Sequence, residues 1–436
     1  MREDIVNVYV AVLPLVFPNG FTIGGSNGKS NALEIERNGE GMPVIRGTSM
    51  AGLLREATEE SDYSDEVELY FGKALDTNED RQESLLVVHD VAMPNASESS
   101  MHNRMNRHTG SPSVANKGLF SVEKTAPGCE GELVLELRYW NAKDAEEGPE
   151  FLEFLAETLN GGALVGGNSN RGGGLCKLKG NAYYLHAYDL SNAEQSAAYL
   201  DWTYAEKKPL AEADKRSVAY GGDRFTVKVS LRIPEGQDLL CAEGSEMVPV
   251  ETERADGTRH WKIPGATLRG IFRGWMSRLA ARSGKKLVDS VEEHRANPHR
   301  KETEMKGNDA IRDLFGSLEQ KGRIHIGDAY SAETADKSHC QSRKHVVIDR
   351  FTGGTNDGKL FEDIVLVSSG LHFSLEISIL DAEQKEVDWL HQTLQALNLG
   401  LIRVGSSKAS GRLEVTSLEL LSNPDDLSFE TELRRI

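Results

Sequence analysis

The sequence has few cysteines, no long apolar run and no signal-peptide layout. Its 436 residues include 4 cysteines, none of them in a C-x-x-C pair, which argues against a disulfide framework and against a regular zinc site. No apolar stretch approaches the roughly 18 residues that a membrane-spanning helix needs. The start, MREDIVNVYV, lacks the basic segment and apolar segment that a signal peptide has in that order. We therefore expect a protein of the reducing cytoplasm without a membrane partner.

The sequence also lacks an excess of basic residues. It has 50 lysines and arginines against 68 aspartates and glutamates, which gives a net charge of −18. Proteins that bind nucleic acid on their own, without sequence preference, usually carry the opposite balance. The charge therefore argues against free-standing nonspecific binding. It is compatible with a basic groove on one face of an acidic body, above all inside a larger assembly.

What the sequence does have is a glycine-rich loop in LVGGNSNRGGGLCKL, residues 164–178. The loop follows a predicted helix over 151–162 and precedes a predicted strand, an order opposite to that of the dinucleotide-binding motif. Gly173 and Gly174 stand where a P-loop needs lysine and then serine or threonine. Neither nucleotide-binding motif therefore fits this loop.

The glycine loop recurs in VGSSKASGRLEV, residues 404–415, after another helical stretch. Other blocks recur in the same order, 218 residues apart for Gly52 and Gly270 and 243 apart for His102 and His345. Shifts of this size indicate a duplicated domain, because solenoid repeats have periods of about 20–50 residues. The paired blocks are RGTSMAGLLRE (46–56) with PGATLRGIFRG (264–274), YFG (70–72) with LFG (314–316), LLVVHD (85–90) with RIHIGD (323–328), and HNRMNRHTG (102–110) with HVVIDRFTG (345–353).

The duplication predicts the domain organisation and the fold. We expect a first domain over residues 1–190, a polar linker over 191–222 and a second domain over 223–436. Each half has a β-rich start, a short helix, a long insert, a strand, a helix, the glycine loop and a last strand. This order is the β-α-β-β-α-β plan of ferredoxin-like domains, and the predicted class is α+β.

These blocks, taken together and in this order, resemble the CRISPR-associated RAMP superfamily. The resemblance covers most of the chain twice and implies two tandem ferredoxin-like (RRM-like) RAMP domains with thumb-type insertions. The residues that carry it in the second half are Pro264, Gly265, Leu268, Gly270 and Arg273, then Ile348 to Arg350, Thr352, Gly353, Leu360 to Glu362 and Gly370, and finally Gly405 to Gly411. In the first half they are Gly47, Met50, Gly52 and Arg55, then Asn106, Arg107, Thr109, Gly110, Leu119, Phe120, Glu123 and Gly128, and finally Gly166 to Gly174.

The insert pattern resembles that of backbone subunits of type III effector complexes. The resemblance implies a guide-RNA-binding subunit of an antiviral ribonucleoprotein, with two thumbs that push between nucleotides. The implied partners are crRNA, complementary target RNA and other type III effector subunits.

Residues that suit RNA backbone binding are glycines, which let main-chain amides approach phosphates, and cations or hydroxyls near helix starts. Alternatives stay open: the glycines can simply make a tight turn, the arginines can be ordinary helix-surface residues, and Asp90 and Asp328 can cap a turn or helix. The candidate RNA-binding residues are Ser49, Arg55, His102, Arg107, Gly166, Gly167, Arg171, Gly172, Thr267, Arg269, Arg273, His345, Arg350, Gly405, Lys408 and Arg412.

Active members of this backbone group cleave target RNA with the help of a divalent metal, which here would be Mg²⁺ or Mn²⁺. They depend on an aspartate in the loop after the first strand. The first half has no aspartate there, whereas the second half has Glu246, with Asp238 nearby, as candidate catalytic residues. Two other functions remain open, namely a catalytically silent scaffold and a crRNA-processing endoribonuclease that uses His102 or His345 as general acid or base.

Overall fold

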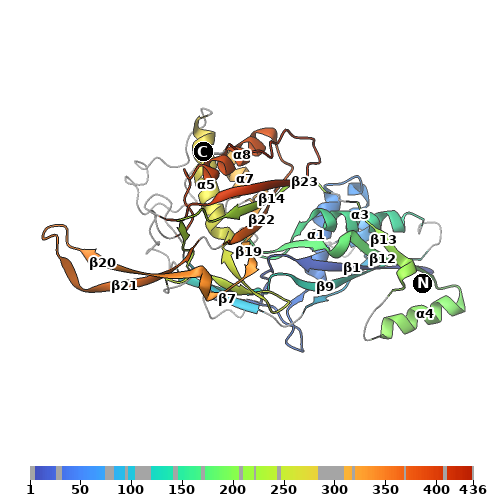
Figure 1. Cartoon of the computed structure of the whole chain (residues 1–436). Coiled ribbons are helices and arrows are strands. Elements are labelled where there is room, and N and C mark those ends of the chain that lie inside the picture. Colours follow the sequence, from blue (N-terminus) through green and yellow to red (C-terminus); the bar gives the residue numbers. More distant parts are fainter. Residues whose placement is uncertain are drawn as a thin grey trace.

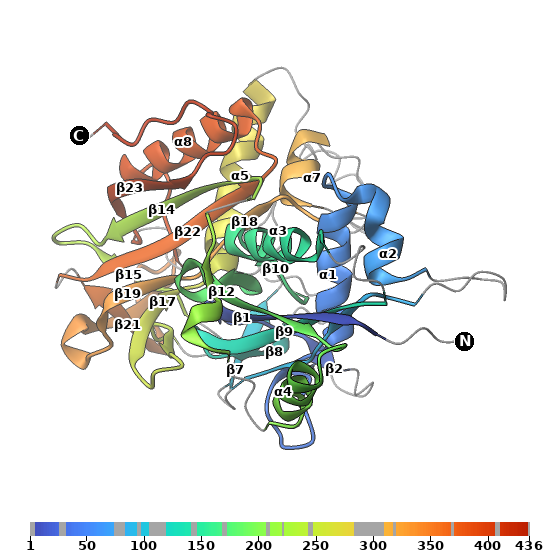
Figure 2. The same cartoon turned by 90° about the vertical axis from the view of Figure 1, so that its right-hand side faces the viewer.

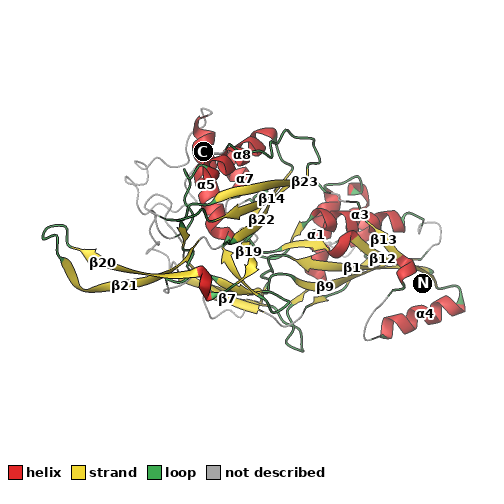
Figure 3. Cartoon of the chain, in the orientation of Figure 1, coloured by secondary structure: helices red, strands yellow, loops and turns green. Residues whose placement is uncertain are grey.

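Each half of the chain is built on an antiparallel sheet whose inner face packs against helices, as the computed structural model shows (Figures 1 and 3). The expectation of an α+β chain with two tandem ferredoxin-like halves is confirmed. None of the described helices is long and apolar enough to cross a membrane. The structure describes residues 5–25, 32–73, 83–93, 97–103, 119–140, 146–167, 172–205, 210–219, 222–242, 247–282, 309–316, 320–367, 370–405 and 410–434.

The central strand of the first half is β1 (Asn7–Phe17), which pairs with β9 (Cys129–Tyr139) along its whole length. Side chains of β1 alternate between two faces, because successive residues of a strand point in opposite directions. Ala11, Leu13 and Leu15 face the helices. The other elements of this half are α1 (Gly47–Glu59), α2 (Val67–Phe71), β5 (Leu86–Val88), α3 (Gly148–Gly161), β10 (Ala163–Leu164), β11 (Leu175–Leu178) and β12 (Ala182–Asp189).

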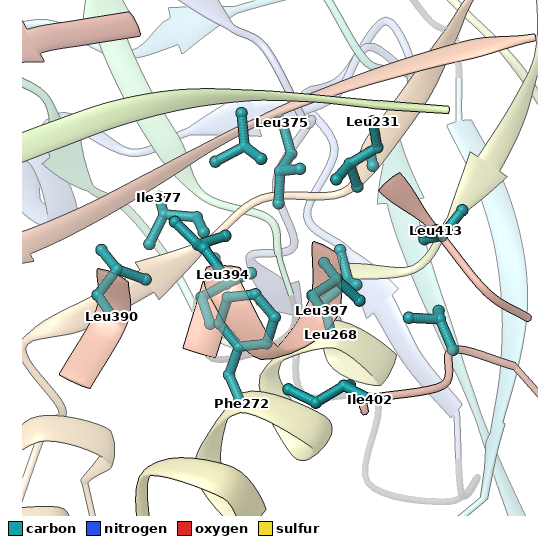
Figure 4. Close-up of a cluster of buried hydrophobic side chains, with 14 of the residues drawn as sticks. Leu231, Leu268, Phe272, Leu375, Ile377, Leu390, Leu394, Leu397, Ile402 and Leu413 are labelled. Carbon is teal, nitrogen blue, oxygen red and sulfur yellow. The ribbon is translucent and has the colours of Figure 1, made fainter. Parts of the chain in front are cut away.

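The second half repeats this arrangement around β14 (Arg224–Arg232). Its core lies between the sheet and two helices, and Figure 4 shows Leu375 and Ile377 of the sheet packed over Leu394 and Phe272 of the helices. The other elements are β15 (Asp238–Leu239), β16 (Glu251–Glu253), β17 (Arg259–Ile263), α5 (Gly265–Arg282), α7 (Asp309–Phe315), β18 (Ile324–Ile326), β19 (Ala329–Thr334), β22 (His372–Leu380), α8 (Gln384–Asn398) and β23 (Glu414–Ser422).

The segment predicted as a linker contains ordered elements that attach to the first half. Within 191–222, α4 (Ala193–Tyr204) packs against β12, and β13 (Lys215–Ser217) extends the first sheet by pairing with β12. Asn192 begins α4 by accepting hydrogen bonds from the amides of Glu194 and Gln195. The polar composition of residues 191–222 predicted a linker. Trp202 of α4 is only 7% exposed, however, so this helix packs as part of the fold.

Both predicted inserts form paired strands. In the second half, β20 (Cys340–Ile348) and β21 (Thr355–Val367) make a long hairpin that reaches away from the body in Figure 1, and we call it the arm. In the first half, β7 (Ser97–Asn103) pairs with β8 (Leu119–Thr125), which also pairs with β3 (Ala32–Ile35). Three short strands remain: β2 (Gly24–Gly25) pairs with β3, and β4 (Val44–Ile45) pairs with β6 (Val91–Ala92).

Candidate nucleic-acid interface

The first glycine loop is held by close contacts between main-chain segments. Gly166 and Gly174 both have positive φ angles, of 80° and 85°. A Cβ added at Gly166 would lie 2.5 Å from the carbonyl oxygen of Thr22, and one at Gly174 would lie 2.5 Å from that of Val165. The Val165 amide donates to the Gly174 carbonyl at 2.8 Å. Any side chain is therefore excluded at both glycines, as the tight-turn interpretation requires.

The second glycine loop has the same geometry. Gly405 has a φ of 106°, and a Cβ there would overlap the carbonyl oxygen of Leu240. The Val404 amide donates to the Gly411 carbonyl at 2.9 Å, and a Cβ at Gly411 would overlap the Val404 carbonyl. The duplication is thus preserved at the level of single hydrogen bonds.

Two other predicted glycines differ from this pair. A Cβ at Gly167 would meet no atom within 4 Å and the residue is exposed, but its amide already donates a hydrogen bond to the Thr22 carbonyl at 3.1 Å. Gly172 instead packs against the second half, because a Cβ there would lie 2.6 Å from a carboxylate oxygen of Asp328. Of the four predicted glycines, Gly166, Gly167 and Gly405 are exposed and Gly172 is buried.

The two helix starts are closed by aspartates rather than left for phosphate. Asp90 accepts a hydrogen bond from the Gly47 amide at 2.7 Å, and Asp328 accepts one from the Gly265 amide at 2.7 Å. The capping interpretation of these aspartates is therefore confirmed. A carboxylate therefore binds the first amide of each helix and compensates the helix dipole there.

The hydroxyl and arginine candidates on these helices lie in different surroundings. Ser49 is exposed and Thr267 is half-buried, in the first turns of α1 and α5. Arg55 is 36% exposed and donates to Glu59 at 3.0 Å and to the Gly72 carbonyl at 3.2 Å. Arg273 is half-buried on α5. Arg55 thus has the contacts of an ordinary helix-surface residue.

Arg269 does not lie where a phosphate could reach it. Its side chain is 8% exposed and donates hydrogen bonds to the carbonyl oxygens of Ile324, at 2.7 Å, and Phe315, at 2.5 Å. The guanidinium also lies 5.2 Å from the centre of the Phe315 ring. The prediction of an RNA contact is replaced by a structural role, because this arginine joins α5 to α7 and β18.

The arm exposes a dense set of apolar side chains. Phe351 at its tip is 99% exposed, far more than a structural aromatic needs. Asp349 fixes the tip by accepting hydrogen bonds from the amides of Phe351 and Thr352, at 2.8 and 2.9 Å, and these bonds lower the pKa of Asp349. The IDRFTG motif therefore encodes a turn that holds Arg350 and Phe351 in solvent. The other exposed apolar residues of the arm are Val346, Val347, Ile348, Leu360 and Phe361.

His345 lies on the same arm. Its ring stacks on Phe361, with 5.0 Å between centres, and its Nε2 lies 2.9 Å from a carboxylate oxygen of Asp363. The ring thus stacks on one neighbour of the adjacent strand and lies close to a carboxylate of another, without a hydrogen bond between Nε2 and that carboxylate. This arrangement is compatible with RNA contact and with proton transfer alike.

Asp238, the described member of the predicted catalytic pair, is engaged in the fold. Its side chain is 9% exposed and forms an ion pair with Arg343 at the base of the arm, while its carbonyl accepts from the Gly411 amide at 2.8 Å. An arginine so close competes with a cation, so Asp238 does not fit a metal ligand. No group of three or more metal-binding side chains lies together within the described ranges.

Five predicted site residues cannot be placed in full. Arg107, Arg171, Glu246 and Lys408 lie outside the described residues, and His102 is described only as a member of β7. Arg412 is described, and its guanidinium lies 3.6 Å from Glu414.

Three exposed cations, two on the arm and one beside the second glycine loop, are candidates for phosphate contact. Most described lysines and arginines are ion-paired, as with Arg37 and Glu123. Lys344 and Arg350 on the arm, and Arg403 beside the second glycine loop, are exposed and have no ion pair recorded within the described part of the chain. Arg350 was predicted from the motif, whereas Lys344 and Arg403 lacked any spacing signal in the sequence.

Comparison with known families gives one match. The model of the RAMP superfamily matches residues 11–177 and 220–413, one region in each half of the chain. A search of the curated proteins finds no match. Two matched regions that together span most of the chain agree with the duplication of sheet, helix caps and glycine loops. The chain therefore belongs to the RAMP superfamily.

Proposed function

We propose that the chain is a guide-RNA-binding backbone subunit of a type III CRISPR ribonucleoprotein that serves antiviral defence. Membership of the RAMP superfamily supports CRISPR-associated RNA binding. The single observation that carries the finer proposal is the arm, which projects from the body and ends in a fully exposed phenylalanine beside Arg350. In this proposal the arm and its counterpart around β7 and β8 hold crRNA and complementary target RNA.

The chemistry of the arm suits an RNA of any sequence. Aromatic side chains stack on every base, at about 1–3 kcal/mol per base, without reading its identity. Lys344 and Arg350 on the arm would contact phosphates near the base that stacks on Phe351, and Arg403 would contact a phosphate nearer the body. Phosphate contacts carry no sequence information, which suits a subunit that accepts any guide.

Purification of the chain with its co-expressed neighbours, followed by extraction of bound RNA, tests the proposal. We expect a small guide RNA in the wild-type complex. An arm variant with Lys344→Ala, Arg350→Ala and Phe351→Ala should retain at least ten-fold less of it. A matched control, Lys179→Ala with Lys321→Ala, changes two exposed lysines of the body and should retain wild-type amounts. Absence of guide RNA from the wild-type complex would contradict the proposal.

The same complexes separate binding from catalysis. Labelled RNA complementary to the guide is added with Mg²⁺ or Mn²⁺. Cleavage at a fixed spacing that is lost in Glu246→Ala assigns target cleavage to this chain, whereas unchanged cleavage makes the chain a scaffold that positions RNA for other subunits. Cleavage of repeat RNA without metal, lost in His345→Ala, would instead support the processing function.

A further inference from the structure

The two halves of the chain join head to tail, with different surfaces from each half. Lys124 of the first half forms a buried ion pair with Asp328 of the second, with 2.6 Å between nitrogen and oxygen. Lys177 of β11 forms an ion pair with Glu376 on the outer face of the second sheet, the face that carries no helix. A head-to-tail contact leaves the receiving surface of the first half and the donor surface of the second half unused. A second molecule can dock on either surface in the same way, unless that surface is blocked.

The unused receiving surface is the outer face of the first sheet, and its equivalent positions can be identified. Glu136 pairs with Val10 of β1, and Glu376 pairs with Lys228 of β14. Val10 and Lys228 lie 218 residues apart, the same shift that relates Gly47 to Gly265. Glu136 is therefore the counterpart of Glu376, the carboxylate that receives the lysine of the other half.

In the first half this position is already occupied by α4. Tyr199 of α4 donates a hydrogen bond to Glu136 at 2.6 Å. Trp202 packs on Val8, Val10 and Val12, which form the outer face of β1. Figures 1 and 2 both show α4 on the side of the β1–β9 sheet opposite to α3. On the second half, this surface of the sheet receives the first half. On the first half, α4 covers the equivalent surface.

The unused donor surface of the second half also differs from that of the first. Counted from Gly174 and Gly411, which make the same loop contacts, the counterpart of Lys177 is Glu414. Glu414 is held by Arg232 at 2.8 Å. A second molecule docked in the same way would bring Glu414 towards Glu136, and two carboxylates in contact repel each other.

We propose that α4 is an end cover, which together with Glu414 prevents a second copy of this chain from docking on the first half in the way the first half docks on the second. The chain then enters its assembly as a single copy, and its neighbour on the α4 side must bind by different contacts. This inference goes beyond the proposed function and does not depend on RNA binding.

Sedimentation of the full chain without RNA, over a wide concentration range, tests the proposal. We expect the wild type and Glu414→Lys to remain monomeric. An uncovered variant replaces α4 by a glycine–serine linker and carries Glu414→Lys with Val8→Thr, Val10→Lys and Val12→Ser. These last three changes give the exposed face the residues that the second half has there, Thr226, Lys228 and Ser230. The uncovered variant should form dimers and larger species as its concentration rises.

Two results would overturn the proposal. One is reversible self-association of the wild type with cross-links between the α4 side and the Glu414 side. The other is an uncovered variant that folds cooperatively yet stays monomeric. If the uncovered variant does not fold, an electron-microscopy structure of the wild-type assembly decides: α4 retained on Glu136 supports the proposal, and a neighbouring RAMP domain in its place contradicts it. Loss of guide RNA would change neither the sedimentation results nor the position of α4. Failure of the proposed function can therefore be told apart from failure of this proposal.

Discussion

Two arginines of the second half, both predicted to bind RNA, illustrate how differently single residues act. Arg269 is buried and donates to two main-chain carbonyls, whereas Arg350 is exposed at the tip of the arm. Arg269→Ala should lower the free energy of unfolding by about 3 kcal/mol, because it leaves buried carbonyls without donors. Arg350→Ala should leave stability within about 0.5 kcal/mol of wild type and weaken RNA binding. Denaturant unfolding and RNA titration of both variants measure this; equal stability of the two would contradict the structural role of Arg269.

Neighbouring glycines in the first loop make a second matched pair. Gly166→Ala should destabilise the chain by about 3 kcal/mol or more, because a positive φ and an overlap with the Thr22 carbonyl are both unfavourable. Gly167→Ala meets open space and should change the free energy of unfolding by less than about 1 kcal/mol. Thermal unfolding compares the two. If Gly167 lies against RNA, its variant should bind guide RNA more weakly at full stability, and unchanged binding would remove Gly167 from the interface.

At the scale of elements, the buried carboxylate of Glu136 is one of the contacts that attach α4, beside the packing of Trp202. Burial alone would raise the pKa of Glu136, but hydrogen bonds from His89, Tyr199 and Arg138 lower it from 4.5 to about 2. The unfolded chain therefore binds the proton more tightly, and the stabilisation from Glu136 is complete above pH 4.5 and is lost as the pH falls towards 2. Its size is on the order of 3 kcal/mol.

The comparison of wild type with Glu136→Gln tests this pH dependence. We expect the wild type to have the higher melting temperature at neutral pH, because the glutamine cannot pair with Arg138. The difference should shrink as the pH is lowered through the window below 4.5. A difference that stays constant from neutral to acidic pH would show that the Glu136 carboxylate does not hold α4 in place.

At the scale of the whole molecule, Asp328 connects the two halves while its counterpart Asp90 does not. Both cap a helix, but Asp328 also binds Lys124 of the other half and is 4% exposed, against 48% for the side chain of Asp90. Burial alone would raise the pKa of Asp328, but Lys124 and Lys262 hold it below its ordinary value. The aspartate is therefore charged and paired inside the junction.

Asp328→Ala should lower the free energy of unfolding by about 3–5 kcal/mol, because it leaves Lys124 buried without its partner. Asp90→Ala removes a helix cap and an exposed ion pair with Arg46, and should cost about 1 kcal/mol. Calorimetry of the wild type should show one cooperative transition, and Asp328→Ala should separate it into two as the halves lose their contact. A single transition in Asp328→Ala, at the temperature of Asp90→Ala, would contradict a junction held by this ion pair.

The sequence by itself determined the duplication, the α+β class and the residues with local geometric requirements. Gly166, Gly405, Asp90 and Asp328 were recognisable because each acts on main-chain atoms within its own repeat, and the repeat shows the same residue twice. In β22, Phe373, Leu375 and Ile377 alternate with Ser374 and Glu376 in the sequence, and all three apolar residues are buried. Such patterns lie in short windows, which is why a sequence reveals them.

The tertiary structure alone decided which charged groups are free and which are not. Arg269 is buried by α7, Asp238 is paired with Arg343, 105 residues away, and Lys124 with Asp328, 204 residues away. The tertiary structure also decided the role of α4, because the polar sequence of this helix did not indicate that it covers the first sheet. Contacts between distant segments depend on how whole elements pack, and no local spacing records them.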